Sequence, residues 1–241
     1  MNPRRVKING RTICVADDQP TFWAKVEAGR WEPATLAFID AHVDESTTFL
    51  DCGAWIGPTS LYAAFRARSV VAIEADPEAL RQLRSNIAAN QELAEKIVIL
   101  PRALSPRPGL VTMGSRRKPG DSMSSVLFAD AERSWQAEAI TPDELASTLP
   151  AARLVAKIDL EGGEYALLPH FAPILERAAA VHLSLHPAFL MEWVDRDAAA
   201  AAALNRKAMM ALAAFDGAPP NEGLPAGEWV LTRQPRPLAP R

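Results

Sequence analysis

Short apolar segments alternate with helical segments from residue 48 onward, most regularly in the first half of the chain, and this alternation constrains the fold more than any other feature. The segments predicted as strands are 48–51, 70–74, 97–100, 154–160, 179–185 and 228–232. The helical patterns among them are 53–68, 77–90, 165–177 and 197–214. Strands separated by helices are typical of a parallel sheet that is covered on both faces. The sequence therefore predicts an α/β fold with a doubly wound, mostly parallel sheet.

The rest of the chain is predicted to form an N-terminal part, an irregular middle and a tail. Residues 1–45 begin with a strand-and-turn pattern, continue with helices, and are expected to pack on a core domain of residues 46–234. The middle, 105–141, is rich in Pro, Gly, Ser and charge, so it is predicted to be irregular, with a mobile loop at 118–126. Residues 235–241 hold three prolines and are expected to be a frayed tail.

Composition excludes several classes of protein. The net charge of −3 gives no strong field to attract nucleic acid or an anionic membrane. No apolar run approaches the roughly 20 residues that span a bilayer. The two cysteines, Cys14 and Cys52, are too few for a disulfide framework or a cysteine-rich zinc site. They are interpreted as reduced thiols of a cytoplasmic protein.

The loop after the first predicted strand of the sheet has the pattern of a ligand-binding turn. Asp51 ends the strand, and Gly53 and Gly57 follow before the next helix. Glycine permits a sharp turn and a close approach of a ligand, and a helix N-terminus offers free N–H groups. A dinucleotide fingerprint would place a glycine where Asp51 stands, and Asp51 suits a cationic ligand better than a pyrophosphate. The alternative is an ordinary strand–helix turn.

An acidic residue at the end of the next strand supports a nucleoside-type ligand. Glu74 follows Asp51 by 23 residues and precedes Asp76 and Pro77, which suit the N-cap and first position of a helix. An acid at this place can accept the hydroxyls of a ribose. Taken alone, Glu74 could equally be a solvated loop acid. The two motifs in this order favour an adenosine-type ligand.

Several short motifs between residues 31 and 175 together match a known family. They are Trp31-Glu32-Pro33, the glycine loop 51–57, the segment 71–77, Asn86-Ile87, Ala103-Leu104-Ser105 and the Lys-Ile-Asp-Leu-Glu-Gly-Gly-Glu run at 157–164. With these motifs the chain resembles class I S-adenosylmethionine-dependent methyltransferases, and more narrowly the FkbM-type methyltransferases. One departure is Trp55, where the family usually has asparagine.

The resemblance implies a fold, a cofactor and a set of contacts. It implies a Rossmann-like sheet of seven strands, an enzyme that transfers a methyl group (EC 2.1.1.-), and S-adenosyl-L-methionine as the cofactor. The residues implied in binding the cofactor are Glu32, Asp51, Gly53, Ala54, Trp55, Gly57, Thr59, Glu74, Ala75, Ala103 and Asp159.

Three residues at strand ends are candidates for the chemistry. Asp159 and Glu161 would point the same way if their strand continued that far, and His186 follows the next strand. Methyl transfer needs alignment of the reactants and removal of a proton if the acceptor is a hydroxyl. Either Glu161 or His186 could be the base, while His182 lies deeper and reads as a core histidine. The same three residues could hold a metal, but a metal-free site is favoured.

The expected reaction is O-methylation of a hydroxyl on a small molecule or glycan. No Asp/Asn-Pro-Pro-aromatic run follows the fourth strand, which disfavours amino-methylation of DNA bases. The alternatives are a metal-dependent O-methyltransferase, a nicotinamide-dependent oxidoreductase and a catalytically silent cofactor-binding domain. Neither a nucleic-acid nor a membrane partner is expected, and a homo-oligomer stays open.

Overall fold

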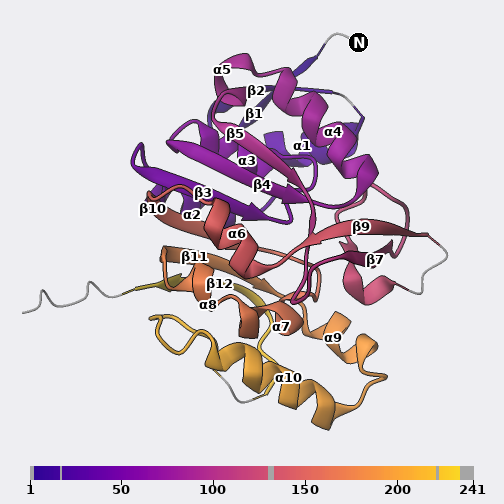
Figure 1. Ribbon diagram of the computed structural model, residues 1–241. Coiled ribbons are helices and arrows are strands. Elements are labelled where there is room, and N and C mark those ends of the chain that lie inside the picture. Colours follow the sequence, from indigo (N-terminus) through magenta and orange to yellow (C-terminus); the bar gives the residue numbers. More distant parts are fainter. Residues whose placement is uncertain (1–2, 17, 130–132, 221–222, 234–241) are drawn as a thin grey trace, which may run out of the picture.

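The structure is a computed structural model that describes residues 3–16, 18–129, 133–220 and 223–233. Its centre is a six-stranded sheet in the order β12-β11-β10-β3-β4-β5 (Figure 1). The strands are β3 (Thr47–Cys52), β4 (Ser69–Glu74), β5 (Ile97–Pro101), β10 (Arg153–Ile158), β11 (Ala178–Leu185) and β12 (Gly227–Thr232). All pair in parallel except β12, which runs antiparallel to β11.

The predicted α/β fold with a mostly parallel sheet is confirmed. Each of the six predicted strand segments is a strand, and within the described residues the main sheet has six strands where the resemblance implies seven. The strand order reverses at β3, which has β4 on one side and β10 on the other. Ligands of open α/β sheets bind beyond the carboxyl ends of strands at such a reversal.

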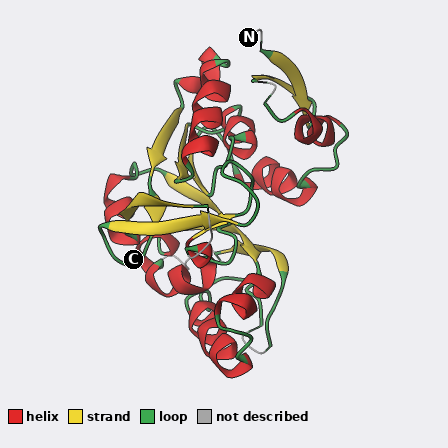
Figure 2. Cartoon of the chain, turned by 90° about the vertical axis from the view of Figure 1, so that its right-hand side faces the viewer, coloured by secondary structure: helices red, strands yellow, loops and turns green. Residues whose placement is uncertain are grey.

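Helices flank the sheet on both sides (Figure 2). Those from the first part of the chain pack on one face and those from the second part on the other. The first group is α1 (Pro20–Glu27), α2 (Pro33–His42), α3 (Pro58–Ala64), α4 (Pro77–Ala88) and α5 (Gln91–Ala94). The second is α6 (Pro142–Thr148), α7 (Glu164–Leu167), α8 (Ala172–Leu175), α9 (Pro187–Trp193) and α10 (Ala198–Met210). Because side chains alternate along a strand, Phe49 of β3 joins the first core and its neighbour Leu50 joins the second.

The N-terminal segment forms the predicted strand and turn. β1 (Arg4–Ile8) and β2 (Arg11–Val15) pair antiparallel around Asn9 and Gly10, which both have positive φ. Two side-chain amides, Asn86 of α4 and Asn90 just before α5, bind this segment: the Asn90 Oδ1 accepts from the Cys14 N–H and the Asn86 Oδ1 from the Ala16 N–H, each at 2.8 Å.

The predicted irregular middle is wrong, because residues 103–140 contain a second sheet. It has four strands in the order β6-β9-β7-β8: β6 (Ala103–Leu104), β7 (Leu110–Ser115), β8 (Ser124–Ser125) and β9 (Ser134–Ile140). A 3₁₀ turn, η1 (Val126–Phe128), follows β8. The apolar contacts of this sheet are few, with Met113 and Ala137 against Ala103. Only β9 alternates apolar and polar residues, with Trp135, Ala137 and Ala139 separated by Gln136 and Glu138. Because β6 and β8 have two residues each, the period-two signal of this sheet is short.

Three predicted boundaries also differ. The helix predicted at 53–68 begins only at Pro58, because the preceding loop holds residues in left-handed conformations. The helix predicted at 165–177 is divided into α7, a 3₁₀ turn η2 (Leu168–His170) and α8, because Pro169 and Pro173 lack the N–H donor of a continuous helix. The strand predicted at 154–160 ends at Ile158. The predicted tail, 235–241, lies outside the described residues.

No helix in the described part of the chain has both the length and the apolar character needed to cross a membrane.

Candidate active site at the carboxyl end of the sheet

The loop between β3 and α3 turns sharply because three of its residues have left-handed backbone. Gly53 has φ 83°, Trp55 49° and Gly57 91°. A Cβ on Gly53 would collide with the Asp159 carbonyl oxygen, and one on Gly57 would lie 2.5 Å from Leu83 Cδ1. The glycines therefore let the loop pack closely on the end of β10 and on α4.

Asp51 lies beneath this loop. It is fully buried, and its Oδ2 accepts hydrogen bonds from the hydroxyls of Thr59 and Ser60, both at 2.6 Å. Its Oδ1 lies 3.6 Å from the Nζ of Lys157. Neither Asp51 nor Gly57 is part of the pocket wall. Asp51 thus anchors the start of α3 from behind the site.

Lys157 was not among the residues predicted for the site, although it stands in the Lys-Ile-Asp motif. It is buried at the end of β10, with its Nζ 3.3 Å from Asp159 Oδ2 and donating to the Gly53 carbonyl at 3.2 Å. Burial lowers the pKa of Lys157, but the charges of Asp159, Asp51 and Glu32 raise it well above its ordinary value. The side chain is therefore an ammonium group at the base of the pocket.

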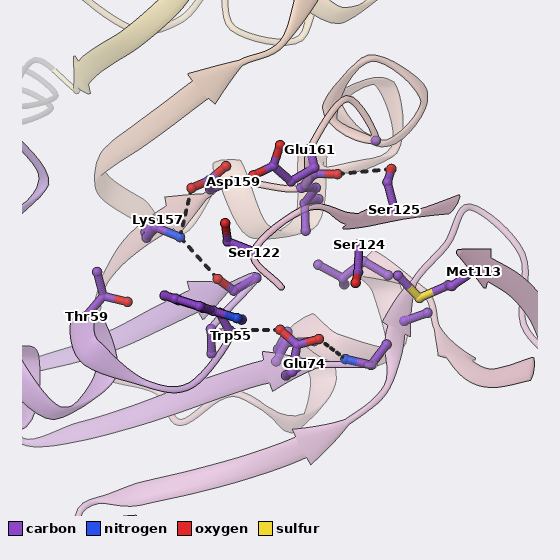
Figure 3. Close-up of a pocket in the computed structure, with 18 of the residues that line it drawn as sticks. Trp55, Thr59, Glu74, Met113, Ser122, Ser124, Ser125, Lys157, Asp159 and Glu161 are labelled. Atoms are coloured by element: carbon purple, nitrogen blue, oxygen red, sulfur yellow. Dashed lines mark hydrogen bonds and ion pairs between the residues drawn. The ribbon is translucent and has the colours of Figure 1, made fainter. Parts of the chain in front are cut away.

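Glu74 at the end of β4 is held by backbone donors (Figure 3). Its Oε2 accepts from the Trp55 N–H at 2.8 Å, and its Oε1 accepts from the N–H groups of Ala75 and Asp76 at 2.8 and 2.7 Å. Burial raises the pKa of Glu74 to about 7, although these three hydrogen bonds lower it. Because a carboxylate has about four acceptor positions, one position on Oε2 stays open.

Asp76 joins the start of α4 to a loop over the pocket. Its Oδ1 accepts from the backbone N–H groups of the first turn of α4, as predicted for an N-cap. Its Oδ2 accepts from the Gly120 N–H at 2.8 Å and the Ser124 hydroxyl at 2.7 Å. The indole N–H of Trp55 donates to the Gly120 carbonyl at 2.9 Å. The loop 118–126, predicted to be mobile, is thus tied to both halves of the nucleoside-type motif.

A single pocket brings together most of the predicted site residues. Its lining includes Glu32, Gly53, Ala54, Trp55, Thr59, Glu74, Ala75, Ala103, Asp159 and Glu161. The loop 118–126 contributes Ser122, Ser124 and Ser125, and the second sheet contributes Met113, so the walls combine polar and apolar surface (Figure 3).

Glu32 reaches the pocket from the start of α2. It is the N-cap residue of this helix, with a left-handed backbone at φ 40°. Its Oε2 is buried and has no hydrogen-bond partner. Burial raises the pKa of Glu32 to about 7; the charge of Lys157 lowers it and that of Asp159 raises it. A cationic group in the pocket would satisfy this oxygen.

The argument that placed Asp159 and Glu161 on one face of a strand is wrong, because β10 ends at Ile158. Glu161 instead lies in a turn with φ 51°, and Gly162 follows with φ 96°. Both acids nevertheless line the pocket. Burial and the charge of Asp159 raise the pKa of Glu161 to about 7, while His186 lowers it.

His186 lies behind these two acids, at the N-cap of α9. Its Nε2 is 3.7 Å from Asp159 Oδ1 and 3.6 Å from Glu161 Oε2, and its Nδ1 is 2.8 Å from Glu164 Oε1. Burial lowers the pKa of His186, but the hydrogen bond and charge of Glu164, with the charges of Asp159 and Glu161, raise it to about 9. His186 is not part of the pocket wall. Glu164 was not predicted, although it ends the motif.

His182 is a core residue, as expected. It is fully buried beneath the site with its ring 5.3 Å from that of Phe38, and burial lowers its pKa to about 4.

Among the described residues, Asp159, Glu164 and His186 have oxygen or nitrogen atoms within 4.8 Å of one another. Glu164 Oε1 already accepts the Leu160 N–H and pairs with His186 Nδ1. His186 thus pairs with Glu164 through a hydrogen bond and with Asp159 at ion-pair distance, and we do not assign a metal to this group.

Neither a protein-family model nor a curated protein matches the chain in sequence. Solved structures do match. The methyltransferase FkbM from Methylobacillus flagellatus KT has 16% identity and a TM-score of 0.50, over 78% of this chain and 44% of that one. Precorrin-6y C5,15-methyltransferase from Geobacter metallireducens GS-15 has 15% identity and a TM-score of 0.38, over 68% and 66%. The Streptococcus mutans protein SMU.1697c, solved with SAH, has 11% identity and a TM-score of 0.47, over 83% and 94%.

The chain thus spans less than half of the FkbM chain and 66% of the precorrin enzyme. Identities this low describe architecture only. The sheet order and the likeness to FkbM show that this chain has the α/β fold of class I methyltransferases.

Proposed function

We propose that this protein is an S-adenosyl-L-methionine-dependent methyltransferase that methylates a hydroxyl group of a small molecule or glycan. The observation that carries the proposal is the buried, unpartnered Oε2 of Glu32 in a pocket that also holds Glu74 and Asp159. S-adenosylmethionine supplies an activated methyl group on a positively charged sulfur, and it carries an ammonium group and a ribose. A carboxylate-lined pocket at the carboxyl end of a parallel sheet suits these groups.

The pocket residues divide into two ends with different chemistry. At one end, Glu74 has an open acceptor position for a ribose hydroxyl, and Ala75, Ala103 and Met113 give apolar surface for an adenine ring. At the other end, Glu32 and Asp159 would hold the ammonium group, and the positive charge of Lys157 lowers the pKa of both acids and so favours their charged forms. The two ends fit the two halves of the cofactor.

Two features support an uncharged hydroxyl acceptor rather than nucleic acid. Glu161 lines the pocket beside Asp159, and its raised pKa, about 7, suits a group that accepts a proton near neutral pH. Glu228, at the start of β12, has a pKa raised by burial and by the charge of Asp159, so it adds to the negative charge near that residue. Carboxylates gathered in this way repel phosphate.

Calorimetric titration of the protein with S-adenosylmethionine and with its product S-adenosylhomocysteine tests the proposal. Both should bind, and NADH should not. Glu74→Ala should weaken binding at least tenfold, because hydrogen bonds to a charged group contribute roughly 1.5–3 kcal/mol each. The exposed Glu92→Ala is the matched control and should bind as the wild type does. Unchanged affinity in Glu74→Ala would place the ribose elsewhere.

We also propose that the reaction needs no metal, since hydrogen bonds already hold Glu164 and His186. Methyl transfer to an acceptor found by substrate screening should therefore survive exhaustive chelation. Loss of turnover that magnesium or calcium restores would support the metal-dependent alternative instead. Binding of the cofactor without transfer to any acceptor would support a silent binding domain.

A further inference from the structure

His186 is fixed on three sides at the edge of the pocket. Its Nδ1 lies 2.8 Å from Glu164 Oε1, and its ring stacks on that of Phe189 at 5.6 Å with an interplanar angle of 7°. Its Nε2 faces Asp159 Oδ1 at 3.7 Å and Glu161 Oε2 at 3.6 Å. The imidazole therefore has one orientation, with one nitrogen turned to a buried acid and the other to the pocket acids.

Glu164 is the buried acid, and it holds more than the imidazole. It is fully buried at the first position of α7, its Oε1 also accepts the Leu160 N–H at 2.9 Å, and its Oε2 has no partner. A buried carboxylate needs a positive partner to stay charged. His186 is in direct contact to supply it. Through Leu160, Glu164 also fixes the turn whose next residue is Glu161.

We propose that Glu164 is a positioning residue that holds His186 as an imidazolium, which in turn orients Glu161 as the base that takes the proton of the acceptor hydroxyl. The inference depends on the proposed function, because it names the roles within that site. Glu161 lines the pocket and would touch the acceptor, whereas Glu164 and His186 act through it.

The step balances in the following way. The acceptor O–H bond breaks and its proton goes to the Glu161 carboxylate, while the oxygen electron pair forms the bond to the methyl carbon. The electron pair of the carbon–sulfur bond goes to sulfur, which gives neutral sulfide in S-adenosylhomocysteine. His186 keeps both of its ring protons throughout. Its positive charge stabilises the carboxylate form of Glu161 before the transfer.

The charges around His186 agree with this assignment. Asp159, Glu161 and Glu164 face it, and together they raise its pKa to about 9 against the effect of burial. Lys157 lies on the far side of Asp159. Beyond the ring of Phe189 stands Arg116, 5.0 Å from the ring centre and paired with Glu192 at 3.0 Å. The contacts nearest to the imidazole are therefore acidic.

Nuclear magnetic resonance of the protein without cofactor tests whether Glu164 holds His186 in its charged form. Labelled imidazole nitrogens should show both ring nitrogens of His186 protonated at pH 7.5. Glu164→Gln should lower the pKa of His186 by about one unit or more, because it removes the charge and keeps the shape. The pKa of Glu161, followed by carboxyl carbon signals, should then rise. The exposed His170 is the internal reference, and its imidazole signals should be the same in both proteins at each pH.

Two results would overturn the inference. One is a neutral imidazole of His186 at pH 7.5 in the wild type. This measurement uses the wild-type protein alone, so it does not depend on whether a variant folds. The other is an unchanged titration of His186 and Glu161 in Glu164→Gln. Glu164→Asp, which keeps the charge, should retain the raised pKa of His186 and so separates charge from packing. Failure to bind S-adenosylhomocysteine would contradict the proposed function instead, and it is measured separately.

Discussion

Acidic side chains of one chemical type have different environments within this site, and the backbone decides the difference. Asp51 points inward because the loop above it turns at Gly53 and the hydroxyl of Thr59 caps it. Glu32 and Glu161 point into the pocket from left-handed positions that a strand or helix would not provide. Burial raises the pKa of Glu32 and Glu161, so it decides more than the number of carboxylates whether these groups can exchange a proton near neutral pH.

This difference gives a division of labour that substitution can separate. Glu161→Gln should leave binding of S-adenosylmethionine nearly intact and slow methyl transfer by about 10²–10⁴-fold, the usual contribution of a general base. Asp159→Asn should weaken both steps, because Asp159 is paired with Lys157 and lies toward the cofactor end. Calorimetry measures the affinity of each variant for S-adenosylmethionine, and initial rates with an identified acceptor measure methyl transfer.

The outcome can contradict the assignment in two ways. Glu161→Gln could bind the cofactor as weakly as Asp159→Asn, which would put both acids on the cofactor. Alternatively, Glu161→Gln could react at the wild-type rate, which would make His186 the base. Glu228→Gln, a substitution at an exposed acid that does not line the pocket, is a control that should change the rate much less.

At the scale of elements, the sequence predicted the strands of the main sheet and failed where tertiary contacts decide the structure. β4 contains the continuous apolar run 70–73, and β3 is marked by Phe49 and Leu50 just before the glycine loop. The sequence does not mark where β10 ends. The Asp159 N–H still bonds to the Cys52 carbonyl of β3, although the strand ends at Ile158. The second sheet was missed because β6 and β8 have only two residues each and β7 does not alternate, so β9 alone has a period-two pattern.

The loop 118–126 lines the site, and the indole N–H of Trp55 binds it at the Gly120 carbonyl. Trp55→Phe keeps an aromatic ring beside Phe22 and removes only the N–H that binds the Gly120 carbonyl. A hydrogen bond of this kind contributes about 0.5–1.5 kcal/mol, so amide hydrogen exchange over 118–126 should quicken by several-fold.

Mass spectrometry of proteolytic peptides measures this exchange. Trp193→Phe is the matched control, because Trp193 is exposed on α9 and its substitution should leave the loop unchanged. Equal exchange in Trp55→Phe and the wild type would mean that Asp76, through Gly120 and Ser124, holds the loop without help from the indole.

At the scale of the whole molecule, the site was predictable in outline because its residues stand at the ends of neighbouring strands. Glu74 and Asp159 could be placed in this way from their order in the sequence. Lys157 and Glu164 could not, since their importance arises from partners on other elements: Lys157 meets Asp51 of β3, and Glu164 meets His186 after β11. Ion pairs between strands have no periodic signal in a sequence.

The buried acids also link stability to pH. Glu32, Glu74 and Glu161 have a pKa of about 7 in the folded protein against an ordinary 4.5, so the folded state binds more protons than the unfolded state between these values. The free energy of unfolding should therefore fall as the pH rises from 5 to 7. His182, with its pKa lowered to about 4, opposes this trend up to about pH 6.5. His186, with its pKa of about 9, extends the fall above neutral pH.

Urea unfolding of the protein without cofactor should thus show greater stability at pH 5 than at pH 8. Glu32→Gln should flatten this dependence on pH: the difference in the free energy of unfolding between pH 5 and pH 8 should shrink by up to about 3 kcal/mol, the value of a pKa shift of this size. The exposed Glu92→Gln should leave it unchanged. Saturating S-adenosylmethionine should also flatten it, because a bound cation favours the charged carboxylates. A slope that neither Glu32→Gln nor the ligand alters would show that these acids are ionised in the free protein and that the cation binds elsewhere.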